Sequence, residues 1–258
     1  MNASSRLAVP SMRDHVSAEE WQTRCDLAAC YRLVAHFGWS DLVFTHITAR
    51  VPGKPGEYLI NPYGMLFHEI TASALIKIDA QGNALQESPF AVNPAGFLIH
   101  SAVHSARHDA QCVIHVHTLN GVAVSAQKQG LLPLSQQSMF VLASLAYHDY
   151  EGVAINEGER ARLSADLGGK TFLMLRNHGL LTLGPSIGDA FLAMYTFEAA
   201  CAIQVRAMSG GAALLPIAAE LVATAQHQAS VVTKSLGGQL VWPGLLRLAR
   251  TLDMSYES

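Results

Sequence analysis

Apolar residues recur at helical spacing in several long segments of the chain. Between Ser17 and Gly38 they return every three or four positions, and Ser17 with Glu20 has the spacing of a capping box. Gly38 follows the last apolar position, where glycine commonly ends a helix. The same criteria predict further helices within residues 93–109, 120–128, 186–211, 216–234 and 243–252.

Other segments alternate between apolar and polar residues, which is typical of half-buried strands. In residues 42–51, Val43, Thr45 and Ile47 share one face, while His46 and Thr48 share the other. Further strands are predicted near 57–60, in 74–85 as a hairpin around a turn at 82–83, in 112–118, and in 170–184 around a turn at 177–179. Because no repeat or linker divides the chain, we expect a flexible leader at residues 1–15 and one α/β domain over 16–258.

The segment CVIHVHT, residues 112–118, carries two histidines at strand spacing. Positions i and i+2 of a strand face the same way, so His115 and His117 lie side by side. Two such imidazoles repel when protonated and lose hydration when buried unpaired, and a bound cation would stabilise them. His178, in the turn after an apolar strand, is the best third ligand. Three neutral imidazoles suit zinc, and iron, manganese or cobalt also fit; the alternative is three unrelated core or surface histidines.

Two further clusters have less specific patterns. His100 and His104 lie one helical turn apart, but Ser101 occupies the position of the glutamate in a zinc-protease motif. We therefore interpret His104 and His108 as solvated side chains rather than parts of a second metal site. The polar residues 147–150 could supply proton transfer, although a polar turn with packed tyrosines is the commoner structure.

Composition excludes several classes of function. The 258 residues carry a formal net charge of −3 and no basic run, which argues against nucleic acid as a partner. The N-terminal residues lack the apolar core of a secretory signal, and no run of about 18 apolar residues is present. The four cysteines have no CxxC spacing and are interpreted as reduced thiols. We therefore expect a cytoplasmic protein that contacts neither nucleic acid nor membrane.

Four motifs taken together resemble the class II aldolase/adducin family, and more narrowly its adducin-like branch. They are FGWSDLVFTHITARVPG, LINPYGMLFHEITASALIKID, NPAGFLIHSAVHSARHDAQCVIHVHT and LRNHGLLTLG, and the resemblance spans about residues 17–210. It implies a three-layer α/β/α sandwich around a mostly antiparallel sheet, in homotetramers with sites at the subunit interfaces. It also implies a divalent metal, usually zinc, held by three histidines that match His115, His117 and His178.

The chain departs from the family at its acid–base and phosphate-binding groups. The position of the family's catalytic glutamate is Gly96, and that of its serine pair is Pro94-Ala95. The early phosphate element corresponds to residues 45–48, and its partner loop survives in part at 62–64. Loss of the serine pair implies a substrate without a phosphate in the usual place. The positions that match substrate contacts are Thr45, His46, Tyr63 and Gly64.

A positioned general base contributes roughly 10²–10⁴ in rate, so another group would have to replace the glutamate. The candidates are His46, Tyr63, Tyr147, His148 and, from a neighbouring subunit, Tyr256. Their order of preference is not set by the sequence.

Three functions remain open. The intact histidine set favours a zinc-dependent lyase that cleaves a carbon–carbon bond or decarboxylates, through a metal-stabilised enolate of a small carbonyl or sugar-like substrate. An iron oxygenase with three histidines on the same fold would need no glutamate. A non-catalytic, adducin-like assembly domain is the third. Residues 240–258 carry an apolar stripe that covers the chain's own core or docks on a neighbouring subunit of the expected tetramer.

Overall fold

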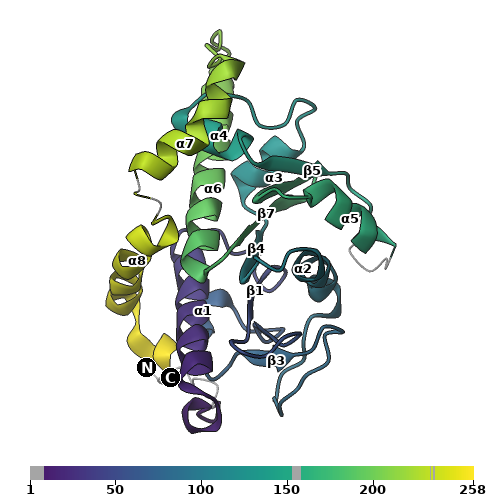
Figure 1. Ribbon diagram of the computed structural model, residues 1–258, viewed down its shortest axis with the longest axis vertical. Coiled ribbons are helices and arrows are strands. Elements are labelled where there is room, and N and C mark those ends of the chain that lie inside the picture. The colour runs from purple at the N-terminus through teal and green to yellow at the C-terminus, as the bar shows by residue number, and fades with distance from the viewer. Residues whose placement is uncertain (1–8, 153–157, 233, 235) are drawn as a thin grey trace, which may run out of the picture.

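The computed structural model describes residues 9–152, 158–232, 234 and 236–258, which are arranged around one sheet (Figure 1). Its seven strands follow the spatial order β3-β2-β1-β4-β7-β6-β5. Every neighbouring pair is antiparallel except β5 and β6, which run parallel. The strands are β1 (His46–Arg50), β2 (Tyr58–Ile60), β3 (Ile76–Ile78), β4 (Cys112–Val116), β5 (Leu145–His148), β6 (Phe172–Leu175) and β7 (Gly179–Gly184).

Helices cover both faces of this sheet (Figure 1). On one face lie α1 (Ala18–His36), α3 (Leu119–Ser125) and α6 (Ile187–Ser209); α8 (Gly238–Leu252) packs on α1 and α6. On the other face lie α2 (Pro94–Ala106) and α5 (Glu159–Leu167). The helices α4 (Gln136–Leu142) and α7 (Val222–Val232) pack together beside α6, and short 3-10 helices span Arg13–His15, Phe67–Glu69, Ala219–Leu221 and Met254–Glu257.

Two hydrophobic cores separate the three layers. Along β4, Cys112, Ile114 and Val116 belong to the core against α1 and α6, whereas Val113 belongs to the core against α2 and α5. His115 shares the face of Val113 because side chains alternate along a strand. The expected three-layer α/β/α sandwich around a mostly antiparallel sheet is therefore confirmed.

Local signals set the ends of the two longest helices. The Ser17 hydroxyl accepts a hydrogen bond from the Glu20 backbone N–H at the start of α1, and Ser186 does the same for Asp189 at the start of α6. Within α1, the fully buried Tyr31 hydroxyl accepts from the backbone N–H groups of Ile47 and Asn61, at 2.7 and 3.2 Å. These bonds fix α1 against β1 and the loop after β2.

The structure corrects the sequence-based elements in three places. The expected return strand near residue 84 is a single bridge between Ile78 and Ala84. Strand β5 and helices α4 and α5 had no predicted counterpart, and residues 147–148 lie in β5 rather than in a turn. Helix α8 begins at Gly238 instead of residue 243, because the Gly238 N–H bonds the Asp189 carboxylate at 2.6 Å while Pro243 is accommodated inside the helix.

The end of the chain packs on its own domain. The apolar side chains of α8, Trp242 among them, cover the core between α1 and α6, and the Trp242 ring N–H bonds Asp26. The Tyr256 carbonyl accepts from the Ala72 N–H at 2.8 Å. At the other end, residues 1–8 of the expected leader lie outside the described residues, whereas Val9 and Met12 already contact the domain. None of the helices described is long and apolar enough to span a bilayer.

Candidate metal centre

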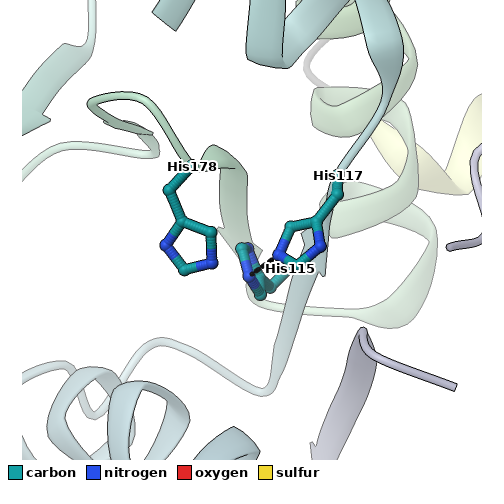
Figure 2. A group of neighbouring side chains, drawn as sticks. All are labelled: His115, His117 and His178. Carbon is teal, nitrogen blue, oxygen red and sulfur yellow. Dashed lines mark hydrogen bonds between the residues drawn. The ribbon is translucent and has the colours of Figure 1, made fainter. Parts of the chain in front are cut away.

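Three histidines from two separate segments converge at one end of β4 (Figure 2). His115 lies in β4 and His117 immediately beyond it, while His178 belongs to the turn that joins β6 to β7. Their ring centroids are mutually 4.8 Å apart, and their candidate ligand atoms all lie within 4.8 Å of one another. The sequence prediction that these three residues meet is therefore correct as geometry.

The backbone of the β6–β7 turn brings His178 to the strand. Asn177 has a left-handed conformation with φ of 56°, which asparagine tolerates better than most residues. Gly179 then passes so close to β4 that a Cβ there would lie 2.6 Å from the Val116 carbonyl oxygen and 3.1 Å from the His117 ring. Only glycine fits at this position without displacing the strand that carries two of the histidines.

Hydrogen bonds fix which nitrogen His115 and His117 present to the centre of the cluster. His115 Nδ1 donates to the Leu180 carbonyl at 3.0 Å, and His117 Nδ1 donates to the Asp41 carboxylate at 3.0 Å. In the neutral rings, both Nε2 atoms then carry lone pairs, and these two atoms are only 3.0 Å apart. Two facing lone pairs repel, so the arrangement requires a shared proton or a cation between them.

Burial makes His115 and His178 neutral ligands rather than cations. Desolvation holds the pKa of His115 well below its ordinary value, and the neighbouring His178, His117 and His46 rings lower it further. Desolvation, followed by His117 and His148, lowers the pKa of His178 to about 4. Tetrahedral zinc with bonds of about 2.0–2.1 Å would separate neighbouring ligand nitrogens by about 3.3 Å, close to the 3.0 Å between the Nε2 atoms of His115 and His117. The donor set therefore fits a divalent zinc-type ion.

Two groups that support the cluster had no signal in the sequence. Asp41 precedes Leu42, a non-glycine residue with φ of 46°, and its carboxylate completes a carboxylate–histidine pair of the kind that orients metal ligands. After His117, the Thr118 hydroxyl and the Asn120 amide both donate to the buried Glu198 carboxylate of α6. These contacts orient the His117 ring and anchor the chain that follows it.

A second group of histidines lies beside the first, on the α2 side of the sheet. His46 is the cross-strand partner of His115, with ring centroids 5.8 Å apart, and its ring lies 4.0 Å from that of His100. The expectation that His104 is solvated is wrong, because His100 and His104 are both buried and both bond the Thr48 hydroxyl. The face of α2 that carries them packs on β1 and β4. His108 is exposed, as expected.

Within the described part of the chain, the other expected substrate contacts share no hydrogen bond, ion pair or ring contact with the three histidines. Thr45 is buried and immediately precedes β1. Tyr63 and Gly64 form an exposed turn, where Gly64 has φ of 100°. Gly96 lies in the first turn of α2, one helical turn before His100.

The three remaining candidates for proton transfer differ in position. His148 ends β5 beside the β6–β7 turn, with its Nδ1 bonded to Asp166 at 2.7 Å, so it is close to the cluster but buried. Tyr147 points the opposite way, and its hydroxyl accepts from the Leu131 N–H. Tyr256 is buried at the end of the chain, where it bonds Glu257.

Comparison with known proteins places the chain in a family. The model of the class II aldolase and adducin N-terminal domain matches residues 25–205. The chain belongs to this family. A Pseudomonas aeruginosa relative named "Putative aldolase class 2 protein" is 62% identical over 235 residues, which are 90% of each chain. Mouse alpha-adducin is 47% identical over 189 residues, which cover 72% of this chain but only 26% of the adducin.

Solved structures of the family have the same fold. An aldolase II superfamily protein from Pseudomonas syringae has a TM-score of 0.92 at 46% identity, with 96% of this chain and 100% of that chain covered. The L-fuculose 1-phosphate aldolase of Glaciozyma antarctica has a TM-score of 0.81 at 27% identity, covering 93% and 94% of the two chains. The family and fold inferred from the sequence motifs are confirmed.

Proposed function

We propose that this member of the class II aldolase family is a metal-dependent lyase with His115, His117 and His178 as the ligands of a zinc-type divalent ion. The observation that carries the proposal is the 3.0 Å distance between the Nε2 atoms of His115 and His117. The Nδ1 atoms of both rings already donate hydrogen bonds, so both Nε2 atoms carry lone pairs. A divalent ion bound there would act as a Lewis acid that polarises a substrate carbonyl and stabilises the negative charge that develops on it.

The protein's own residues have separate tasks in this mechanism. Asp41 and the Leu180 carbonyl hold the two strand histidines in the required tautomer and orientation. His115 is buried, whereas the His117 side chain is 20% exposed, so the cluster is open on the His117 side. The exposed Leu119 follows in the chain, and Tyr150 lies with its ring 6.3 Å from His178. A small carbonyl or sugar-like substrate would enter from this side.

A proton-transfer group is still needed, since position 96 is glycine. We infer that it is a histidine, because His46 lies against His115 and His148 lies beside the turn that carries His178. The tyrosine candidates are less suited to this task in their own chain. The Tyr147 and Tyr256 hydroxyls are both engaged in other contacts.

Metal analysis and a substrate panel test the proposal. Purified protein is expected to bind one zinc per chain and to turn over at least one member of a panel of aldol and β-keto-acid substrates. His117→Ala should abolish both metal binding and turnover, while the exposed His108→Ala should leave both unchanged. Stoichiometric metal without turnover on the panel would refute the lyase, and no metal binding would refute the metal centre.

The same measurements separate the other two functions. Protein that acquires iron in preference to zinc and consumes oxygen with a substrate would be an oxygenase. Protein that binds no metal and has no turnover would fit an assembly domain, the role suggested by the similarity to alpha-adducin. We also propose a homotetramer located in the cytoplasm; light scattering that returns a single chain of 27.7 kDa would contradict the assembly.

A further inference from the structure

A buried hydrogen-bonded chain lies behind the metal centre, between β1 and α2. The Thr48 hydroxyl is 2.7 Å from His100 Nδ1 and 2.8 Å from His104 Nε2. His104 Nδ1 is in turn 3.1 Å from the Ala110 carbonyl oxygen. The side chains of all three linked residues are almost completely buried, so water does not compete for these bonds.

Only one assignment of protons satisfies this chain when the rings are neutral. The Ala110 carbonyl can only accept, so His104 carries its proton on Nδ1 and its Nε2 is an acceptor. Thr48 has a single hydroxyl proton, which it donates to His104 Nε2. The Thr48 oxygen therefore accepts from His100 Nδ1–H, and His100 is left with a lone pair on Nε2.

The electrostatics keep both rings neutral. Burial, and then the charges of neighbouring histidines, hold the pKa of His100 well below its ordinary value. Burial and the Arg50 guanidinium lower the pKa of His104 to about 3. Protonation of His100 at neutral pH would also bury a charge without a carboxylate in contact with it among the described residues.

The free end of the chain belongs to His100, which is separated from the candidate metal centre by the His46 ring. His100 Nε2 is fully buried, and the described residues place no hydrogen-bond donor within reach of it. Its ring lies 4.0 Å from His46, which itself contacts the proposed ligand His115. A buried acceptor without a donor typically costs about 1–3 kcal/mol, so this atom is expected to receive a hydrogen bond from a bound molecule.

We propose that His100 Nε2 is a substrate-recognition atom, which accepts a hydrogen bond from a neutral hydroxyl group of the substrate, directly or through one buried water. The proposal rests on the proposed function and specifies its substrate as an unphosphorylated hydroxycarbonyl compound. His100 is the binding residue, while Thr48 and His104 are positioning residues that act through it.

The same polarity disfavours a phosphate group at this end of the site. A fixed lone pair repels phosphate oxygens, and no proton is available on His100 Nε2 to reverse this. The cation packed against the chain is Arg50, whose guanidinium already donates to the carbonyls of His104 and Ala110 and lies over the Tyr58 ring. The Arg50 guanidinium therefore binds backbone carbonyls rather than a ligand.

The tautomer is tested first, on metal-free protein, by long-range ¹⁵N NMR of labelled histidines, with His100→Gln to assign the signal. His100 should carry its proton on Nδ1. Thr48→Val, which keeps the shape but loses the hydroxyl, should abolish this preference, and Thr48→Ser should restore it. Thr182→Val is the matched control, because Thr182 is also a fully buried strand threonine whose hydroxyl bonds a backbone carbonyl, that of Ala190. It should leave the signal unchanged.

Calorimetry on zinc-loaded protein then compares dihydroxyacetone with dihydroxyacetone phosphate as probes. Wild type should bind dihydroxyacetone at least as tightly as its phosphate. Thr48→Val should weaken dihydroxyacetone binding about 5–10-fold, the value of one neutral hydrogen bond, whereas Thr48→Ser and Thr182→Val should change it less than twofold.

Three results would overturn the inference: a His100 proton on Nε2, tighter binding of the phosphate, or binding of neither probe. Failure to bind zinc would instead refute the proposed function. That failure is recognised separately, since the tautomer is measured without metal.

Discussion

Gly179→Ala is the substitution that tests the geometry of the metal centre most directly. The added methyl carbon would lie 2.6 Å from the Val116 carbonyl oxygen, a distance that real Cβ atoms essentially never show, and 3.1 and 3.5 Å from the His117 and His115 rings. The nearest atom belongs to the backbone of β4 and cannot rotate away. The strand must therefore shift, and the two histidines shift with it.

The size of the effect follows from two separate costs. Overpacking a well-packed site typically destabilises a protein by about 1–3 kcal/mol, so the free energy of unfolding should fall by about this amount. Displacing the rings by a few tenths of an ångström disturbs the Asp41 and Leu180 bonds that orient them, and loss of such orienting bonds typically lowers metal affinity about 10–100-fold. The zinc affinity should thus fall by more than the loss of folding stability alone would cause.

Gly184→Ala supplies the matched control. Its Cβ would lie 2.5 Å from the Ala190 backbone nitrogen, an equally severe backbone contact in the same strand, but about 17 Å from position 179. Urea unfolding and competitive zinc titration on both variants separate the two costs. Both should lose stability, and only Gly179→Ala should lose zinc affinity. Equal zinc affinities in the two variants would refute the proposed role of these histidines as ligands.

Three further predictions concern single residues. Asp41→Asn should lower zinc affinity about 10–100-fold, measured by competitive titration, because the amide orients His117 less well than the carboxylate; an unchanged affinity would exclude an orienting role. The folded pKa of His104, about 3, lies below its unfolded value of 6.5, so the unfolded chain binds the extra proton. The stability that neutral His104 contributes should then be fully present above about pH 6.5, and the free energy of unfolding should fall towards pH 3 by up to about 1.4 kcal/mol per pH unit. In metal-free His104→Leu, urea unfolding at a series of pH values should show a dependence of this free energy on pH that is smaller by that amount. Tyr31→Phe should destabilise by about 2–4 kcal/mol in thermal or urea unfolding, because two buried backbone N–H groups lose their acceptor; a cost below 1 kcal/mol would contradict this reading.

Much of the fold follows from short-range patterns in the sequence. The alternation in residues 42–51 predicted that His46 and Thr48 share a face, and both lie on the α2 side of β1. The His-x-His spacing and the histidine in a turn predicted the three-histidine cluster, because strand geometry alone places His115 and His117 side by side. The family resemblance added the layer order and matched the same three histidines to the family's metal ligands.

The parts that were missed depend on contacts between distant segments. Asp41 lies in an irregular loop 76 residues from its partner His117, so no local pattern indicates their bond. His104 was interpreted as solvated because it has helical spacing among polar residues, whereas its burial is decided by the packing of α2 on β1. Strand β5 has four residues and pairs only with β6, too short a segment for periodicity to identify.

The geometry of the three-histidine cluster bears on whether the domain performs chemistry or serves only in assembly. A domain that only assembles would need a stable sheet, and ordinary residues at positions 41, 178 and 179 would provide one at lower cost than a strained loop, a left-handed turn and a glycine at a close strand contact. Here all three features act on the same imidazoles. The loop orients His117, the turn presents His178, and the glycine lets β7 approach β4 closely. The left-handed residues Leu42 and Asn177 in the loop and the turn are locally unfavourable, and they make sense if an ion offsets their cost. Local strain concentrated on one set of ligands is the pattern of a functional site, which favours the lyase over the assembly domain.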